Sequence, residues 1–269
     1  MTEVTPIPAA SRGVLYPARL PTFHREPVTG GLAAFVRWFW IPEWDIDPGR
    51  TSRQHVIGFP ACNLVVEDGR TGISGPTTRA SYRDLTGRGW AVAALLRPAA
   101  VPALVHDPAL LRDTYRRLDH PDLASAVRAA MRTDAPADER RRAAVAVFAE
   151  WLQGRLGVPS DEALLANRLA ETAETDPAIV TVTDLADQLH ISTRSLQRLA
   201  AKYIGLSPAA LIRRRRLQEA AERLRRDPDL DLASLAHEFG YADHAHLTND
   251  FRSSLGLTPS DYRRALPPT

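Results

Sequence analysis

The sequence predicts an α+β fold: an N-terminal small β-barrel or sandwich with helices, then an all-α domain of two helix-turn-helix units joined by a long helix. Three observations lead to this prediction. Residues 30–105 contain short apolar runs separated by Gly and Pro, as strands do. From about residue 107 onwards apolar residues recur with helical spacing. Near the C-terminus, one helical pattern occurs twice.

Composition is that of an ordinary globular protein, with 44% hydrophobic and 25% charged residues and a formal net charge of +2. The only cysteine is Cys62, which excludes an internal disulfide framework and a cysteine metal cluster and favours the reducing cytoplasm. The longest apolar stretch, residues 90–105, is interrupted by charge and proline, so we expect no membrane span. We also expect no bound metal, no cofactor and no catalytic residue.

The N-terminal half divides into an arm and a domain. Residues 1–22 are Pro-rich and unpatterned, which predicts a flexible arm, and residues 23–158 are expected to form the first domain. Its predicted strands contain the apolar runs at residues 38–40, 55–57, 63–66 and 90–92. Apolar residues at helical spacing predict helices over residues 140–156 and 161–172. The second domain is expected to cover residues 161–269.

The repeated pattern consists of two short helices with a tight turn between them. Gly-Leu-Ser-Pro at residues 205–208 returns as Gly-Leu-Thr-Pro at residues 256–259, where each glycine ends one helix and each proline opens the next. The predicted N-caps are Thr183 or Asp184 and Ser192 in the first unit, and Asp231 and Asp243 in the second. The predicted turns lie at residues 190–191 and 240–241. Residues 208–226 form the predicted long helix between the units.

The second helix of each unit combines an apolar back with a polar face. Leu196 and Leu199 supply the predicted buried side of the first one, and Arg194, Gln197 and Arg198 point the other way. Arginine pairs bidentately with guanine and glutamine with adenine, so this face suits the DNA major groove. In the second unit Leu247 and Phe251 are expected to be buried. The outward residues there are His244, Thr248 and Asn249.

Residues 161–265 resemble the DNA-binding domain of the AraC/XylS family of transcription regulators. The resemblance rests on Ser-x-Arg-x-Leu-Gln-Arg at residues 192–198, FGYADHAHL at residues 239–247, and the following Phe-Arg, Gly-x-Thr-Pro and Tyr-Arg motifs. It implies base-reading or DNA-contacting roles for Arg194, Gln197, Arg198, His244, Ala245, Thr248, Asn249 and Arg252. Many members have arginine where this chain has Asn249, and Ala245 offers only an apolar contact. The second unit is therefore expected to read less sequence than the first.

The same resemblance implies an upstream sensor or dimerisation domain. The segments at residues 59–66, 75–76 and 96–100 are similar to the N-terminal domain of a less-studied subfamily of those regulators. Trp38, Trp40, Trp44 and Trp90 are candidates to line an apolar ligand pocket, the alternative being ordinary core aromatics. Arg97 is a candidate to bind a ligand carboxylate, the alternative being a structural salt bridge.

The predicted function is a sequence-specific transcription regulator whose partner is double-stranded DNA. A small-molecule effector, RNA polymerase and a second copy of the chain are further expected partners. One alternative makes the chain a DNA-repair alkyl-transfer enzyme fused to the same DNA-binding domain; such enzymes need reactive, usually clustered cysteines, whereas Cys62 stands alone. Another gives the N-terminal domain a purely dimerising role. The run Arg213–Arg216 is expected either to contact phosphates or to form a solvated, ion-paired surface.

Overall fold

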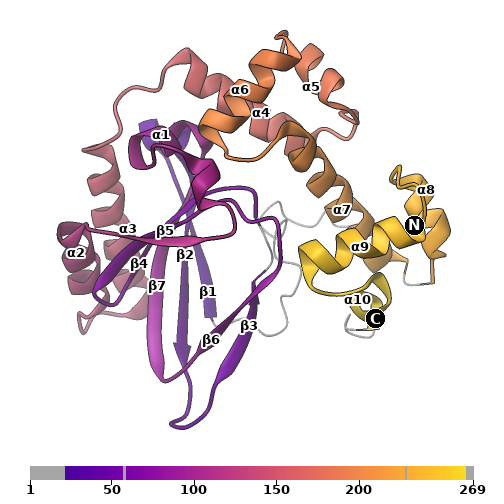
Figure 1. Cartoon of the computed structure of the whole chain (residues 1–269). Coiled ribbons are helices and arrows are strands. Elements are labelled where there is room, and N and C mark those ends of the chain that lie inside the picture. Colours follow the sequence, from indigo (N-terminus) through magenta and orange to yellow (C-terminus); the bar gives the residue numbers. More distant parts are fainter. Residues whose placement is uncertain (1–21, 57–58, 228, 265–269) are drawn as a thin grey trace, which may run out of the picture.

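The computed structural model describes residues 22–56, 59–227 and 229–264 (Figure 1). The predicted arm, residues 1–22, lies outside the described residues except for Thr22, which begins the first strand. The order of elements confirms the predicted α+β class, with strands up to residue 118 and helices alone after it. Among the described residues, no helix is long and apolar enough to cross a membrane.

The N-terminal part is built on an antiparallel sheet. The strands are β1 (Thr22–Pro27), β2 (Val36–Asp45), β3 (Ser52–Val56), β4 (Asn63–Glu67), β5 (Arg70–Ser74), β6 (Ser81–Leu85), β7 (Arg88–Leu96) and β8 (Tyr115–Leu118). Six of them form one sheet in the order β1-β2-β7-β4-β5-β8, and β3 pairs with β6 as a separate two-stranded ribbon. Because β1 and β8 lie at opposite edges of the sheet, it does not close into a barrel, and the predicted sandwich describes it better.

The two faces of the sheet are covered differently. On β7, Val92 and Ala94 point towards the main core, whereas Ala91 and Ala93 point to the other face, where they pack with Trp40. The helices α2 (Pro121–Met131) and α3 (Ala137–Gln153) cover the main-core face. Phe148 of α3 contacts Phe39 of β2 with ring centroids 5.4 Å apart. The alternation of β7 thus decides which side the helices cover.

Short helices connect the sheet to the C-terminal part. These are η3 (Gly30–Ala34), η4 (Pro98–Ala100), α1 (Val101–Leu104) and η5 (Pro108–Leu111). After them α4 (Asp161–Thr175) packs on both parts of the molecule. The buried amide of Asn167 on α4 accepts a hydrogen bond from the Ala99 backbone N–H at 2.9 Å and donates one to the Ala34 carbonyl at 2.7 Å. This one side chain therefore fixes α4 against two turns of the N-terminal part.

The C-terminal helices follow the predicted repeat. They are α5 (Val182–Gln188), α6 (Thr193–Tyr203), α7 (Pro208–Arg226), α8 (Leu232–Glu238), α9 (His244–Leu255) and α10 (Pro259–Arg264). The N-caps Ser192, Asp231 and Asp243 are confirmed. The prediction of Thr183 or Asp184 as the cap of α5 is wrong. Thr181 is the cap, and Asp184 completes a capping box by accepting from the Thr181 backbone N–H.

The long helix α7 belongs to two hydrophobic cores. Leu211 and Ile212, in its first half, join a continuous core that also contains the sheet, α3, α4, α5 and α6. Leu217 and Leu224, in its second half, belong to a separate core with α8, α9 and α10. The first helix-turn-helix unit therefore shares its core with the N-terminal part, and the second unit is attached through α7.

Candidate nucleic-acid interface

The first unit presents α6 through a tight turn and a cap. His190 ends the first helix in the left-handed region, with φ of 55°, which reverses the chain within a few residues. The Ser192 hydroxyl then accepts a hydrogen bond from the Ser195 backbone N–H at 3.1 Å. Leu196 and Leu199 are buried beneath the helix. These contacts set the direction of α6 and leave its opposite face to solvent.

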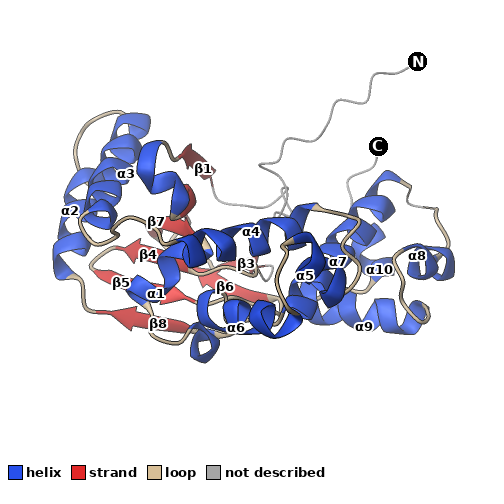
Figure 2. Cartoon of the chain, turned by 90° about the horizontal axis from the view of Figure 1, so that it is seen from above, coloured by secondary structure: helices blue, strands red, loops and turns tan. Residues whose placement is uncertain are grey.

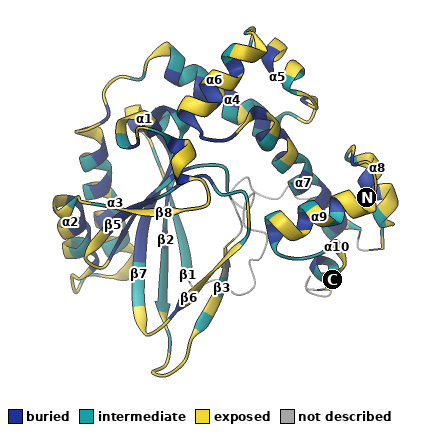
Figure 3. Cartoon of the chain, in the orientation of Figure 1, coloured by how far each residue is buried: buried dark blue, intermediate teal, exposed yellow. Residues whose placement is uncertain are grey.

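That opposite face carries the three predicted reading residues. Arg194, Gln197 and Arg198 are all exposed with the whole chain present, so the N-terminal part does not cover them (Figure 3). One turn further along α6, Lys202 forms a 2.5 Å ion pair with Glu162 of α4. The start of α6 is therefore exposed to solvent, whereas its end is held against α4 by an ion pair.

The second unit repeats this construction on α9. The Asp243 carboxylate accepts from the His246 backbone N–H at 2.7 Å, and Leu247 and Phe251 are fully buried. The ring of Phe251 meets Tyr262 of α10 edge-on at 6.0 Å. Of the predicted contact residues, His244, Ala245, Asn249 and Arg252 are exposed, and Thr248 is half-buried. Thr248 therefore offers less surface than its predicted outward position implied.

The two second helices lie on the same side of the molecule. In Figure 2, α6 and α9 both lie along the lower edge of the helical part, and α7 lies above them in the view. The helix α7 packs against both units, so it fixes one relative to the other. Successive major grooves on one face of DNA lie about 34 Å apart. Two recognition helices on one chain must be spaced to match that distance.

The arginine run on α7 is mostly part of the packing, which corrects the prediction of a phosphate-binding or solvated surface. Arg215 is only 4% exposed and donates to the Ile179 carbonyl and to both oxygens of Glu219. Arg216 donates to the Phe239 carbonyl in the second unit. Arg213 is the exposed member of the run and lies 3.8 Å from Asp250 of α9.

Comparison with known proteins agrees with this geometry. A family model described as a helix-turn-helix domain matches residues 185–265, and a domain of unknown function (DUF6597) matches residues 24–115. An AraC-like transcription regulator of Streptomyces lividans is 37% identical over 105 residues, which are 37% of this chain and 34% of the relative. Over part of its length the chain is thus similar to AraC-like transcription regulators.

A second relative matches over a shorter part of the chain. The transcriptional activator RhaS of Pectobacterium atrosepticum is 33% identical over 79 residues, which are 29% of this chain and 28% of that protein. The chain therefore spans about a third of the length of the curated relatives it matches. Among solved structures, ToxT of Vibrio cholerae covers 86% of this chain and 99% of its own, with 12% identity and a TM-score of 0.41.

The structure does not bring the predicted tryptophans of the N-terminal domain into one pocket. Trp40 lies on the sheet face away from the helices and donates through Nε1 to the Asn63 side chain at 2.9 Å. Trp38, two residues earlier on β2, is stacked under Arg25 at 4.9 Å. Trp90 packs against the main core on the opposite face. Trp38 and Trp40 are thus connected through Phe23 and Arg25 of β1, whereas Trp90 lies apart from them on the opposite face.

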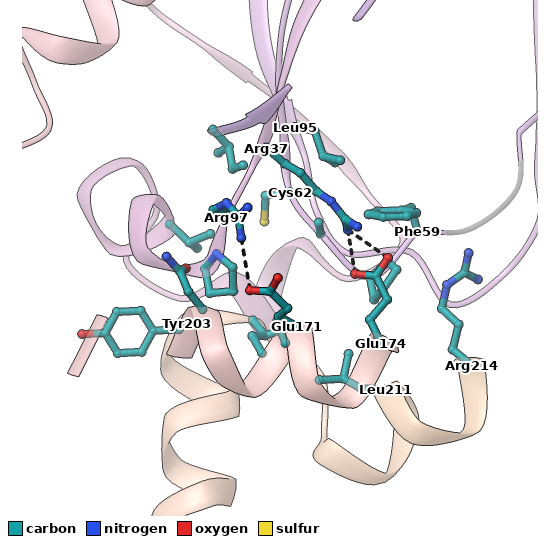
Figure 4. Close-up of a pocket in the computed structure, with 18 of the residues that line it drawn as sticks. Arg37, Phe59, Cys62, Leu95, Arg97, Glu171, Glu174, Tyr203, Leu211 and Arg214 are labelled. Atoms are coloured by element: carbon teal, nitrogen blue, oxygen red, sulfur yellow. Dashed lines mark hydrogen bonds and ion pairs between the residues drawn. The ribbon is translucent and has the colours of Figure 1, made fainter. Parts of the chain in front are cut away.

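Arg97 lies instead at a cavity between the N-terminal part and the helices α4, α6 and α7 (Figure 4). The cavity has a volume of about 160 Å³ and is also lined by Arg37 and Arg214. Arg97 forms a 3.8 Å ion pair with Glu171 of α4. Arg37 was not among the predicted site residues, and its only signal in the sequence is a charged residue inside an apolar strand. Arg214 was expected only as one of four consecutive arginines that contact phosphates or form a solvated surface.

Proposed function

We propose that the chain is a sequence-specific DNA-binding transcription regulator that acts without catalysis. The observation that carries this proposal is the pair of capped helices α6 and α9, each with an exposed polar face and an apolar back, held on one side of α7. Each monomer would lay these two helices in successive major grooves. The partner is double-stranded DNA, as in the predicted function.

The chemistry of the first unit favours base recognition. Arg194 and Arg198 can each form two parallel hydrogen bonds with a guanine edge, and Gln197 can do the same with adenine. Each such pair contributes roughly 1–3 kcal/mol of discrimination against the wrong base. All three side chains are exposed, which leaves them accessible to DNA, and the charge of Glu162 acts on Arg198.

The second unit is the weaker reader in this proposal. Asn249 can pair with adenine, but Ala245 provides only a methyl group. The acidic Asp250 on the same helix adjoins Arg213 and reduces the positive charge near DNA. Arg252 is the exposed basic residue of α9, whereas Arg264 is paired with Asp261 and Arg263 donates to the Leu230 carbonyl. Arg252 therefore acts as a phosphate contact.

The N-terminal domain is proposed to modulate DNA binding, because it contacts both units. Arg112 donates to the Gly205 carbonyl after α6 at 3.1 Å, and the Ala80 backbone N–H donates to the Ser253 carbonyl of α9 at 3.2 Å. A small-molecule effector would act by binding one arrangement of these contacts more tightly than another. A homodimer, contact with RNA polymerase and a cytoplasmic location stay predictions of the same proposal.

The environment of Cys62 disfavours the alternative of an alkyl-transfer enzyme. The thiol is 2% exposed, and its burial raises the pKa to about 12. The thiolate is the nucleophile in such chemistry, so a thiol protonated at neutral pH reacts slowly. Transfer of alkyl groups from alkylated DNA to the protein would revive this alternative.

The proposal is tested by binding of the full chain to DNA fragments that flank its own gene, at several salt concentrations and with non-specific competitor. We expect binding that survives the competitor and weakens as salt increases, because released counterions contribute to it. Arg194→Ala and Gln197→Ala should each lose about 10-fold or more on the selected site, and specificity should relax at one base position.

An arginine outside the recognition helices supplies the control. Arg168 is exposed on α4, so Arg168→Ala removes the same charge without touching a proposed reading face. Equal losses for Arg168→Ala and Arg194→Ala, or equal losses on all sequences, would mean that the arginine contributes charge alone. Loss of all binding with competitor on every fragment would contradict a sequence-specific regulator.

A further inference from the structure

The cavity is lined on one side by residues 59–62 and 95–98 of the N-terminal part. Residues 59–62 and 96–98 belong to the segments 59–66 and 96–100 that resemble the regulator subfamily. The other wall of the cavity comes from α4, from the end of α6 and from α7, the helix that joins the two DNA-binding units (Figure 4). A molecule bound in this cavity would therefore contact both parts of the chain.

The charges around the cavity do not balance. Arg37 holds Glu174 with two hydrogen bonds of 2.6 and 2.9 Å, and Arg97 is paired with Glu171. Arg215 is paired with Glu219. Arg214 is the remaining guanidinium. The charge of Glu174 acts on it, but both carboxylate oxygens of Glu174 are held by Arg37, and the Nε and Nη2 atoms of Arg214 are buried with no hydrogen-bond partner among the described residues. A buried donor without a partner is costly, so this position calls for an acceptor.

The unpartnered atoms of Arg214 have a specific geometry. Nε and Nη2 lie on the same edge of the planar guanidinium, which is the edge that receives a carboxylate through two parallel hydrogen bonds. The guanidinium carbon lies 5.7 Å from the centre of the Phe59 ring, which limits the approach from that side. Burial lowers the pKa of Arg214 to about 10, so the group is still a cation at neutral pH.

The apolar residues that line the rest of the cavity suit a compact apolar ligand. Phe59, Leu95, Val101 and Leu211 contribute side chains from both domains. A volume of about 160 Å³ resembles that of an engineered cavity of roughly 150 Å³ that binds benzene, so a single six-membered ring fits and a long chain does not. A hydrated inorganic anion would leave these apolar walls wet, which favours an organic ligand.

We propose that this cavity binds a small organic carboxylate, whose oxygens pair with the Nε–H and Nη2–H edge of Arg214 and whose apolar body contacts Phe59. This inference rests on the proposed function, because it assigns the site of the effector. The bound carboxylate would tie α7 to the loop 59–62 of the N-terminal domain. Since α7 supports both DNA-binding units, occupancy changes the free-energy difference between their arrangements.

The test is calorimetric titration of the full chain, without DNA, with cyclohexanecarboxylate, cyclohexanecarboxamide and inorganic phosphate. We expect the carboxylate to bind, and the uncharged amide to bind at least about tenfold more weakly, because only the carboxylate matches the cation. Arg214→Gln should weaken carboxylate binding about tenfold or more. Arg226→Gln is the matched control, since Arg226 is exposed on the same helix and paired with Glu222.

Three outcomes would overturn the inference. These are no carboxylate binding at millimolar concentration, equal loss in Arg214→Gln and Arg226→Gln, and tighter binding of phosphate than of the carboxylate. Operator affinity is then measured with and without the carboxylate. An unchanged affinity refutes the effector role. Failure of the chain to bind any DNA in the absence of carboxylate, phosphate and amide would instead count against the proposed function.

Discussion

Adjacent arginines on α7 are expected to respond in opposite ways to the same substitution. Arg215→Met removes a guanidinium that is 4% exposed and makes hydrogen bonds of 2.5 Å to the Ile179 carbonyl and of 2.7 and 2.8 Å to Glu219. Arg214→Met removes a guanidinium whose Nε and Nη2 atoms have no partner among the described residues. The two variants change charge and volume equally, so they differ only in what the arginine contacts.

The magnitude follows from those contacts. Without Arg215, the Ile179 carbonyl loses its donor, and Ile179 is only 3% exposed, which costs roughly 1–3 kcal/mol. Glu219 is 32% exposed, so water replaces part of what it loses. We expect Arg215→Met to lower the free energy of unfolding by about 2–4 kcal/mol. For Arg214→Met, relief of the desolvated charge offsets the lost cation–π contact with Phe59, so stability should stay equal or increase.

Differential scanning calorimetry of the full chain is the appropriate assay. All five tryptophans lie between residues 38 and 151, so tryptophan fluorescence would follow mainly the N-terminal domain, whereas calorimetry detects both domains. Arg215→Met should lower the transition temperature by several degrees, at roughly 2–4 °C per kcal/mol for a chain of this size. An equal drop in transition temperature for both variants, or a larger drop for Arg214→Met, would refute the conclusion that only Arg215 makes stabilising hydrogen bonds.

Three further predictions test local features. Gly205→Ala should destabilise the protein by more than Gly49→Ala, because both residues have positive φ near 79° but a Cβ at Gly205 would lie 2.6 Å from the Pro108 backbone; equal denaturation midpoints would contradict the close approach. Thr181→Ala should cost about 1 kcal/mol in urea denaturation and Thr183→Ala almost nothing, since only the former caps α5; the reverse order would restore the sequence-based cap. Hydrogen bonds from Lys202 and Tyr203 lower the pKa of Glu162 below its usual 4.5. The contribution of these contacts to protein stability is therefore fully present above pH 4.5 and is lost as the pH falls through the lowered pKa. Glu162→Gln should reduce the loss of stability on acidification, and an unchanged pH profile would show that the contacts contribute nothing.

The sequence predicts the C-terminal domain well because its local signals agree with each other. Caps, turns, glycine stops and apolar spacing all occur twice in the same order, and Ser192, Asp231 and Asp243 cap the helices they were expected to cap. The exception is α5, where both Thr181 and Thr183 precede or open the helix and the chemistry of the two side chains is identical. Only the backbone geometry shows that Thr181 is the residue outside the helix.

The sequence predicts less about contacts between distant elements. Four consecutive arginines on α7 look equivalent in the sequence, yet each enters a different environment as the helix turns. The tryptophans of β2 and β7 look like one aromatic group, but strand alternation places Trp40 and Trp90 on opposite faces of the sheet. The cavity beside Arg214 needs α4 and α7 to be docked against the sheet, and local patterns carry no information about that docking.

Footprinting of the selected DNA site shows whether α6 and α9 read successive major grooves from one rigid frame. The wild-type chain should protect two major-groove segments on one face, about one helical turn apart. Arg194→Ala should lose protection in one segment and Asn249→Ala in the other. Protection of a single segment, or loss of both segments in either variant, would contradict the account.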